Sequence, residues 1–143
     1  MRHPINNSSH RGWAWLSLTL ALALHVMDEA LTDFLSVYNP TVRAIRAKFP
    51  FIPLPTFTFE VWLTGLIVAV LLLLLVTPAA FRGGRWVRLI SFPFAALMFG
   101  NGMLHIIGSF YLGRLMPGVY SAPLLLAASA YLWWAINRTE KRG

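Results

Sequence analysis

Histidines and carboxylates recur at helical spacing inside segments of this chain that are otherwise apolar. His25 precedes Asp28 by three residues and Glu29 by four, so on a helix the imidazole projects beside both carboxylates. Asn101 and His105 form a second pair at a spacing of four. A histidine beside a carboxylate is suited to proton transfer near neutral pH, because its ring gains and loses a proton in that range. The spacing therefore predicts an acid–base site to which more than one helix contributes.

The composition indicates that these polar residues lie in a membrane. Hydrophobic residues make up 57% of the 143 residues and charged residues only 12%, against roughly 25% charged residues in soluble domains. The mean hydropathy is +0.63. The chain has no cysteine, which excludes a disulfide-stapled secreted domain, a thiol enzyme and a cysteine-type zinc finger.

The apolar segments predict an all-α protein: a four-helix transmembrane bundle with a short interfacial segment between helices 1 and 2. A crossing takes about 20 apolar residues, so we expect residues 1–143 to form a single integral membrane domain. The expected crossings are residues 13–35, 57–80, 88–112 and 116–137. The first of these also has the basic start and short apolar region of a signal peptide, but no clean polar cleavage site follows it.

The long connection, residues 39–55, is expected to lie along the outer surface of the membrane. Val42, Ile45 and Phe49 recur in it at helical spacing, and Pro50 ends any helix there. Two functions stay open for this segment. It serves either as a simple interfacial anchor or as a lid over a site in the outer leaflet.

Lysine and arginine predict the orientation of the bundle. Eight of them fall on the side that holds both termini, and four fall on the other side. Because cytoplasmic loops carry the excess of these residues, we expect both termini in the cytoplasm and a multi-pass protein of the plasma membrane. The cations lie between apolar runs rather than along one helix face, so we expect no nucleic-acid partner despite a pI of 10.9.

Depth in the bilayer brings the polar residues together. With a rise of about 1.5 Å per residue, His25 and Asn101 each lie about 18 Å from the inner boundary, and Glu29 and His105 about 24 Å. Glu60 begins the second crossing and lies about 6 Å below the outer boundary, at a similar height. Three helices thus converge on one layer.

The carboxylates of this layer need compensation, because a charge at the bilayer centre costs roughly 2.5–3.5 kcal/mol on insertion scales. Asp33, four residues after Glu29, extends the acidic face, and no lysine or arginine lies inside a crossing. Compensation is expected from protonation, from the histidines, from Arg114 reaching inward, from water, or from a divalent metal (Zn, Fe or Mn). The ligands of such a metal would be the nitrogen and oxygen atoms of four side chains: His25, Glu29, His105 and Glu60.

At these residues the chain resembles the HXXEE family of small multi-pass membrane proteins. That family is recognised by a His-x-x-Glu-Glu element, a later Asn-x-x-x-His element and a Pro-Gly pair. Here these are residues 25–29, residues 101–105, and Pro117 with Gly118. Asp28 stands where the family has its first Glu. The resemblance implies a common site for these motifs, and it implies no particular reaction.

We expect a membrane-embedded enzyme that uses this site for proton transfer on a lipophilic small molecule, as an isomerase, cyclase or hydratase, with metal assistance as an open alternative. His25 and His105 would shuttle protons, and Asn101 would orient His105 or the substrate. One of three carboxylates would act as the acid or stabilise a developing positive charge: Asp28, Glu29 or Glu60.

A non-enzymatic function stays open beside this one. A buried network of histidine and carboxylate also fixes helix packing, and such residues carry protons in small transporters, proton-linked carriers and their binding subunits. No acid and no histidine lies in the inner half of a crossing, so a continuous polar path for transport is missing. Assembly as a dimer, or binding to a larger complex, would weaken this objection. The expected partners are the lipid bilayer and a lipophilic small molecule, with a homo-oligomer left open.

Overall fold

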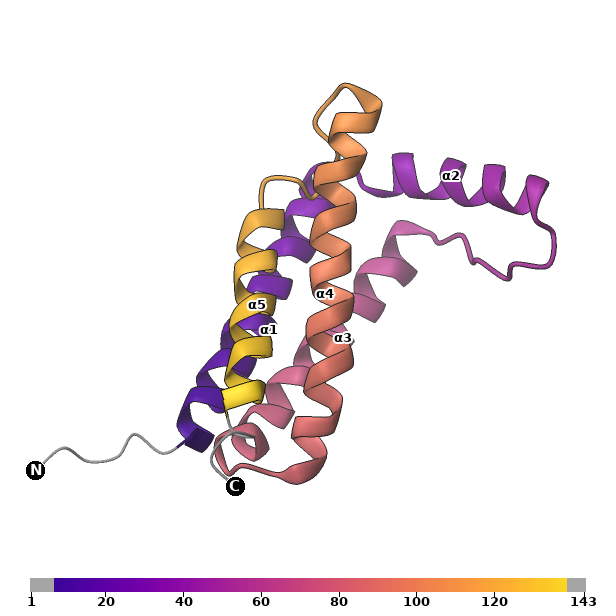
Figure 1. Ribbon diagram of the computed structural model, residues 1–143. Helices are drawn as coiled ribbons and strands as arrows, with labels where there is room; N and C mark the ends of the chain where they lie inside the picture. The colour runs from indigo at the N-terminus through magenta and orange to yellow at the C-terminus, as the bar shows by residue number, and fades with distance from the viewer. Residues whose placement is uncertain (1–6, 139–143) are drawn as a thin grey trace, which may run out of the picture.

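The part of the chain that the computed structural model describes, residues 7–138, folds into five helices and contains no strand (Figure 1). The predicted all-α class is therefore confirmed. The helices are α1 (Asn7–Leu31), α2 (Leu35–Lys48), α3 (Phe59–Phe81), α4 (Arg85–Leu112) and α5 (Ala122–Arg138). Arg2, Lys141 and Arg142, which contribute to the predicted orientation, lie outside the described residues.

α1, α3, α4 and α5 run side by side, and α2 leads away from them at one end (Figure 1). α1 packs against α3 and α5, and α4 packs against α5. The buried contacts combine small and aliphatic side chains, among them Ala14 and Ala21 of α1 and Leu125 and Leu132 of α5. Small residues let helices approach each other closely, so α1 can lie between α3 and α5 at the centre of the bundle.

Within residues 7–138, three helices are long and apolar enough to cross a membrane: Ser9–Leu31, Phe59–Phe81 and Arg85–Leu112. α5, with 17 residues, is shorter. On α3, Leu71, Leu72 and Leu75 are exposed, although leucine is usually a core residue in soluble proteins. An exposed apolar surface of this kind is typical of helices that contact lipid.

The first helix ends at Leu31, rather than near residue 35 as the apolar pattern predicts. Residues 32–34 form a turn in which Asp33 has a positive φ of 56°. Aspartate tolerates this left-handed region better than most residues, so the chain turns here and begins α2 at Leu35. Asp33 is exposed, and the expectation that it extends the acidic face of Glu29 is wrong.

The segment predicted to lie along the membrane surface contains α2, a helix of 14 residues. The side chain of Asn39 accepts the backbone N–H of Phe57 at 3.1 Å and donates to the Phe57 carbonyl at 2.9 Å. Tyr38 donates its hydroxyl proton to the carbonyl of Pro55 at 3.1 Å. These bonds tie the first half of α2 to the segment that leads into α3. Because α2 extends away from the bundle (Figure 1), it does not form a lid over the helix ends in this structure.

α5 begins at Ala122, rather than at residue 116 as predicted. Gly113 ends α4 in the left-handed conformation with φ 62°, and Gly118 has a φ of 83°. Pro117 cannot donate a backbone hydrogen bond to continue a helix, and glycine permits the positive φ that follows. The Pro-Gly pair therefore forms a turn, and we call residues 113–121 the α4–α5 loop.

Candidate functional site

His25, Glu29 and His105 form a buried group where α1 meets α4, which we call the central cluster. Oε1 of Glu29 lies 3.1 Å from Nε2 of His105 and 3.7 Å from Nε2 of His25. The two imidazole rings stand edge to face, with centroids 4.7 Å apart. None of the three side chains is more than 7% exposed. Glu29 and His105 are thus level with each other, as the rise along two parallel helices predicts. One carboxylate oxygen of Glu29 lies near both imidazole rings.

The α4–α5 loop binds the ring nitrogen of His105 that is not the one close to Glu29. This nitrogen, Nδ1, forms a short hydrogen bond with the carbonyl oxygen of Pro117. A carbonyl oxygen only accepts, so Nδ1 carries the proton, and in the neutral ring Nε2 presents a lone pair. That lone pair faces the Glu29 oxygen 3.1 Å away. A proton must therefore lie between Glu29 and His105, on the carboxyl group or on the ring, unless a cation takes its place.

His25 is held by Ser121, the residue before α5. The Ser121 hydroxyl donates to Oδ2 of Asp28 at 2.7 Å, and its backbone N–H donates to the same oxygen at 2.8 Å. A hydroxyl has a single hydrogen, so the Ser121 oxygen accepts from Nδ1 of His25, which is 2.8 Å away. Nε2 of His25 then carries a lone pair, and this buried atom has no hydrogen-bond partner in the part of the chain that the structure describes.

Gly118 lets the α4–α5 loop lie directly on the central cluster. Its backbone N–H donates to Oγ1 of Thr32 at 3.2 Å, which joins the loop to the end of α1. A Cβ atom at this position would lie 2.7 Å from Cε1 of His105 and 3.0 Å from Cγ of Glu29. Any side chain here would therefore collide with the cluster, and the positive φ of 83° also favours glycine.

An aromatic group covers another part of the cluster. The ring of Phe34, in the turn before α2, lies with its centroid 5.6 Å from that of His105. It also stacks on Trp62 of α3, with centroids 5.9 Å apart. Phe34 thus connects α3 to a cluster whose three side chains come from α1 and α4.

The other residues predicted for the site are not members of the central cluster. Asp28 is hydrogen-bonded to Ser121, which in turn is hydrogen-bonded to His25. Asn101 is half-buried on α4, one turn before the α4 histidine. Glu60 is exposed in the first turn of α3, so the structure does not bring it into the predicted ligand set. Arg114 is also exposed and does not reach inward.

The sequence did not predict the contacts that Pro117, Gly118 and Ser121 make. The Pro-Gly pair indicates a turn, and the serine follows it just before a helix. These signals predict where the chain turns. They do not predict that the turn folds onto two histidines from other segments, since that depends on how α5 packs.

The central cluster has the ligand types of a metal site. One ligand atom from each of its three residues lies within 4.8 Å of the other two. Two imidazole nitrogens and one carboxylate oxygen form a set that binds zinc or non-haem iron in proteins. The residues present therefore fit either a shared proton or a metal ion.

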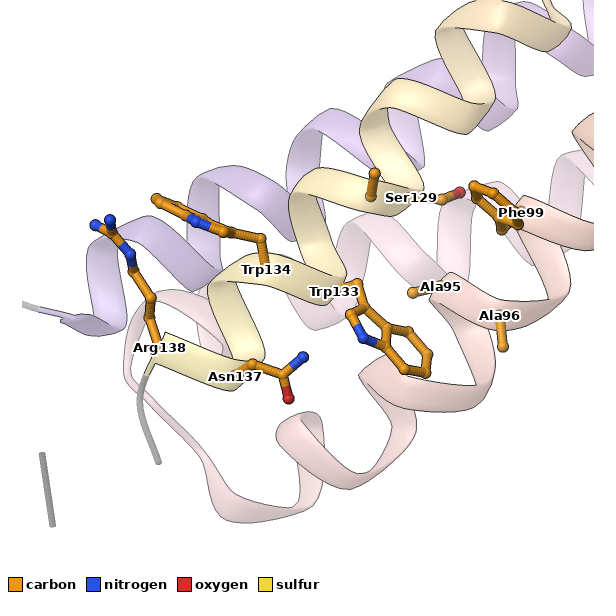
Figure 2. Close-up of a pocket in the computed structure, with 9 residues that line it drawn as sticks. Ala95, Ala96, Phe99, Ser129, Trp133, Trp134, Asn137 and Arg138 are labelled. Atoms are coloured by element: carbon orange, nitrogen blue, oxygen red, sulfur yellow. The ribbon is translucent and has the colours of Figure 1, made fainter. Parts of the chain in front are cut away.

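A groove of about 820 Å³ lies between α4 and α5, toward the other end of the bundle (Figure 2). Phe99 of α4 and Trp133 of α5 line it, and at its end the guanidinium of Arg138 lies 4.2 Å from the centre of the Trp134 ring. No residue of the central cluster lines this groove. The groove and the cluster are therefore separate features.

Comparison with known proteins gives a family match over most of the chain. A family model described as "Protein of unknown function with HXXEE motif" matches residues 15–132. The matched range contains the central cluster and the whole α4–α5 loop. No curated protein and no solved structure matches the chain.

Proposed function

The chain belongs to the HXXEE family, whose motif supplies two of the three cluster residues, and from the geometry of that cluster we propose that it is a membrane-embedded enzyme that transfers protons on a lipophilic small molecule. The observation that carries this proposal is the shared oxygen of Glu29, 3.1 Å from one imidazole nitrogen and 3.7 Å from another. A proton and a free lone pair thus stand side by side in a buried site.

The central cluster holds an acid and a base at the same time. The proton between Glu29 and His105 is the acid, and Nε2 of His25, which has no partner, is the base. Such a site gives a proton to one substrate atom and removes a proton from another, which suits isomerisation, cyclisation or hydration. When Glu29 has given up its proton, its charge stabilises positive charge that develops on the substrate.

The surroundings favour a lipophilic substrate. α1 and α4, which carry the cluster, are both long and apolar enough to cross a membrane. The aromatic ring of Phe34 lies against His105, so the cluster borders an apolar side chain on this side. Phe34 lies in the turn between α1 and α2, and we propose that movement of this turn admits the substrate from the lipid.

We further propose that α5 crosses the membrane beside α1, α3 and α4, which makes four crossings. α5 packs against α1 and α4, and both of these are candidate spans. At about 1.5 Å per residue, the 17 residues of α5 cover about 26 Å, which is close to the thickness of the hydrocarbon core. A helix held along two spanning helices lies in the same slab of lipid.

In the proposed orientation both termini lie in the cytoplasm and the protein resides in the plasma membrane. The chain has no cysteine, so one introduced cysteine reports on one side of the membrane. An impermeant maleimide added to intact cells should label Thr41→Cys on α2. It should label Arg82→Cys, at the turn between α3 and α4, only after the membrane is opened. The reverse pattern would contradict this orientation.

Incorporation of deuterium tests the reaction even though the substrate is unidentified. Membranes that contain the protein are incubated with cellular lipid extract in D₂O, and the lipids are analysed by mass spectrometry. With wild type and with Asp33→Asn, an exposed-carboxylate control, a lipophilic compound should gain solvent deuterium at carbon. With Glu29→Gln or His105→Gln the gain should fall about 100-fold. No labelled compound with wild type, or equal labelling with Glu29→Gln, would overturn the proposal.

A further inference from the structure

Three electron-pair donors converge at the central cluster. Nε2 of His25 and Nε2 of His105 both present lone pairs, because Nδ1 of each ring is used in another hydrogen bond. Both nitrogens face Oε1 of Glu29. Nε2 of His25 is buried without a hydrogen-bond partner, a condition that costs free energy until a partner is supplied. A cation at this point would be a partner for all three atoms.

We infer that Nε2 of His25, Nε2 of His105 and the carboxylate of Glu29 bind one divalent transition-metal ion of the zinc class. Ligands at about 2.0–2.1 Å from a tetrahedral zinc ion stand about 3.3 Å apart. The two nitrogen–oxygen distances in the cluster, 3.1 and 3.7 Å, bracket this value. All three ligand atoms lie within 4.8 Å of one another, so one ion between them is close to each.

The hydrogen bonds on the far ring nitrogens are those of metal-binding histidines. Such histidines donate the other ring N–H to a carbonyl or a carboxylate, which sets the tautomer and the ring orientation. Nδ1 of His105 donates to the carbonyl of Pro117. Nδ1 of His25 donates to Ser121, whose hydroxyl in turn donates to the carboxylate of Asp28. Both rings are therefore oriented with their lone pairs toward Glu29 before an ion binds.

The ligand types select a transition metal over magnesium or calcium. Imidazole nitrogen suits zinc and iron, whereas magnesium and calcium take oxygen ligands almost exclusively. A site with three protein ligands keeps one position for water or substrate. Binding of the ion does not rest on the proposed function. The ion would take the place of the proton between Glu29 and His105 and would occupy Nε2 of His25, so proton transfer would then use water or substrate at the open position, and that use rests on the proposed function. Glu60, exposed on α3, is not one of the ligands.

Metal content and cobalt spectra test the site directly. Wild-type protein is purified in lipid nanodiscs with a tag that contains no histidine, and its metals are measured by elemental analysis. After treatment with a chelator it is titrated with Co²⁺, whose visible absorption reports tetrahedral nitrogen and oxygen ligands, and then with Zn²⁺ as competitor. We expect saturation at a single ion per chain and displacement of Co²⁺ by Zn²⁺.

Variants separate the ligands from the residues that position them. Asp33→Asn should bind Co²⁺ as the wild type does, and Glu29→Gln and His25→Gln should not give the tetrahedral spectrum. Ser121→Ala keeps all three ligands and removes the acceptor of His25, so it should weaken binding by about 10–100-fold without changing the stoichiometry.

Wild-type protein that takes up neither Co²⁺ nor Zn²⁺, or a Glu29→Gln variant that binds them equally well, overturns the inference. The first of these results does not depend on the folding of any variant. The test of metal binding can also fail while the proposed function holds, and the proposed function can fail while metal binding holds. Deuterium incorporation by wild-type protein that binds no metal retains the acid–base function and rejects the ion, whereas metal binding without incorporation retains the ion and rejects the function.

Discussion

Oε1 of Glu29 on α1 lies 3.1 Å from Nε2 of His105 on α4, and the other nitrogen of that ring is already bonded to the carbonyl of Pro117. Two acceptors would face each other here if no proton or cation lay between them. The contact between these two side chains therefore requires a proton or a cation between them.

The two cluster histidines should both carry a proton on Nδ1 in metal-free protein, because Pro117 and Ser121 each accept from that atom. ¹⁵N NMR of protein labelled at histidine measures this directly. Ser121→Ala should allow the other tautomer at His25 and leave the signals of His105 unchanged. A bare Nδ1 on either ring of the wild type would contradict the hydrogen-bond pattern.

Replacement of Gly118 by alanine should destabilise the protein strongly. The new Cβ would lie 2.7 Å from Cε1 of His105, at a residue whose φ is 83°. Backbone strain and overpacking together should lower the free energy of unfolding by about 2–5 kcal/mol. Thermal unfolding in nanodiscs measures the loss. Gly100→Ala is the matched control, since its added Cβ would meet nothing within 4 Å beyond its chain neighbours and the backbone of its own helix. An equal loss there would argue against the contact.

Asp28→Ala should cost about 1–3 kcal/mol of stability, because it leaves the backbone N–H of Ser121 without its acceptor. It also removes the acceptor of the Ser121 hydroxyl, so the orientation of His25 should be lost with it. Unfolding of Asp33→Asn, in which an exposed carboxylate is neutralised, should differ from wild type by no more than about 0.5 kcal/mol. Similar values for the two variants would show that Asp28 has no such role.

Asn39→Ala should loosen the connection between α2 and α3. The variant loses both hydrogen bonds to the backbone of Phe57, at a cost of about 1–3 kcal/mol. Because this connection lies outside the packed bundle, the effect should appear as faster hydrogen exchange of residues 49–58 rather than as global unfolding. Thr41→Ala serves as the control, because its hydroxyl bonds only within α2. Exchange that is unchanged in Asn39→Ala would contradict the prediction.

Helical spacing and rise predicted the pairing of Glu29 with His105, and they failed for Glu60. The rise per residue places all three residues at a similar height in the bilayer. Height does not specify the rotation of a helix about its own axis, and α3 is rotated so that Glu60 is exposed. The predicted ligand set therefore keeps His25, Glu29 and His105 in contact and leaves out its fourth member.

The sequence by itself determined the all-α class, the apolar helices and the common level of the cluster residues, because periodicity, hydropathy and rise are local properties of the backbone. Only the tertiary structure decided that the chain turns at Asp33 and that the α4–α5 loop brings Ser121 and Gly118 onto the histidines. These contacts depend on how α5 packs between α1 and α4, and no local pattern in the sequence encodes the rotation of one helix against another.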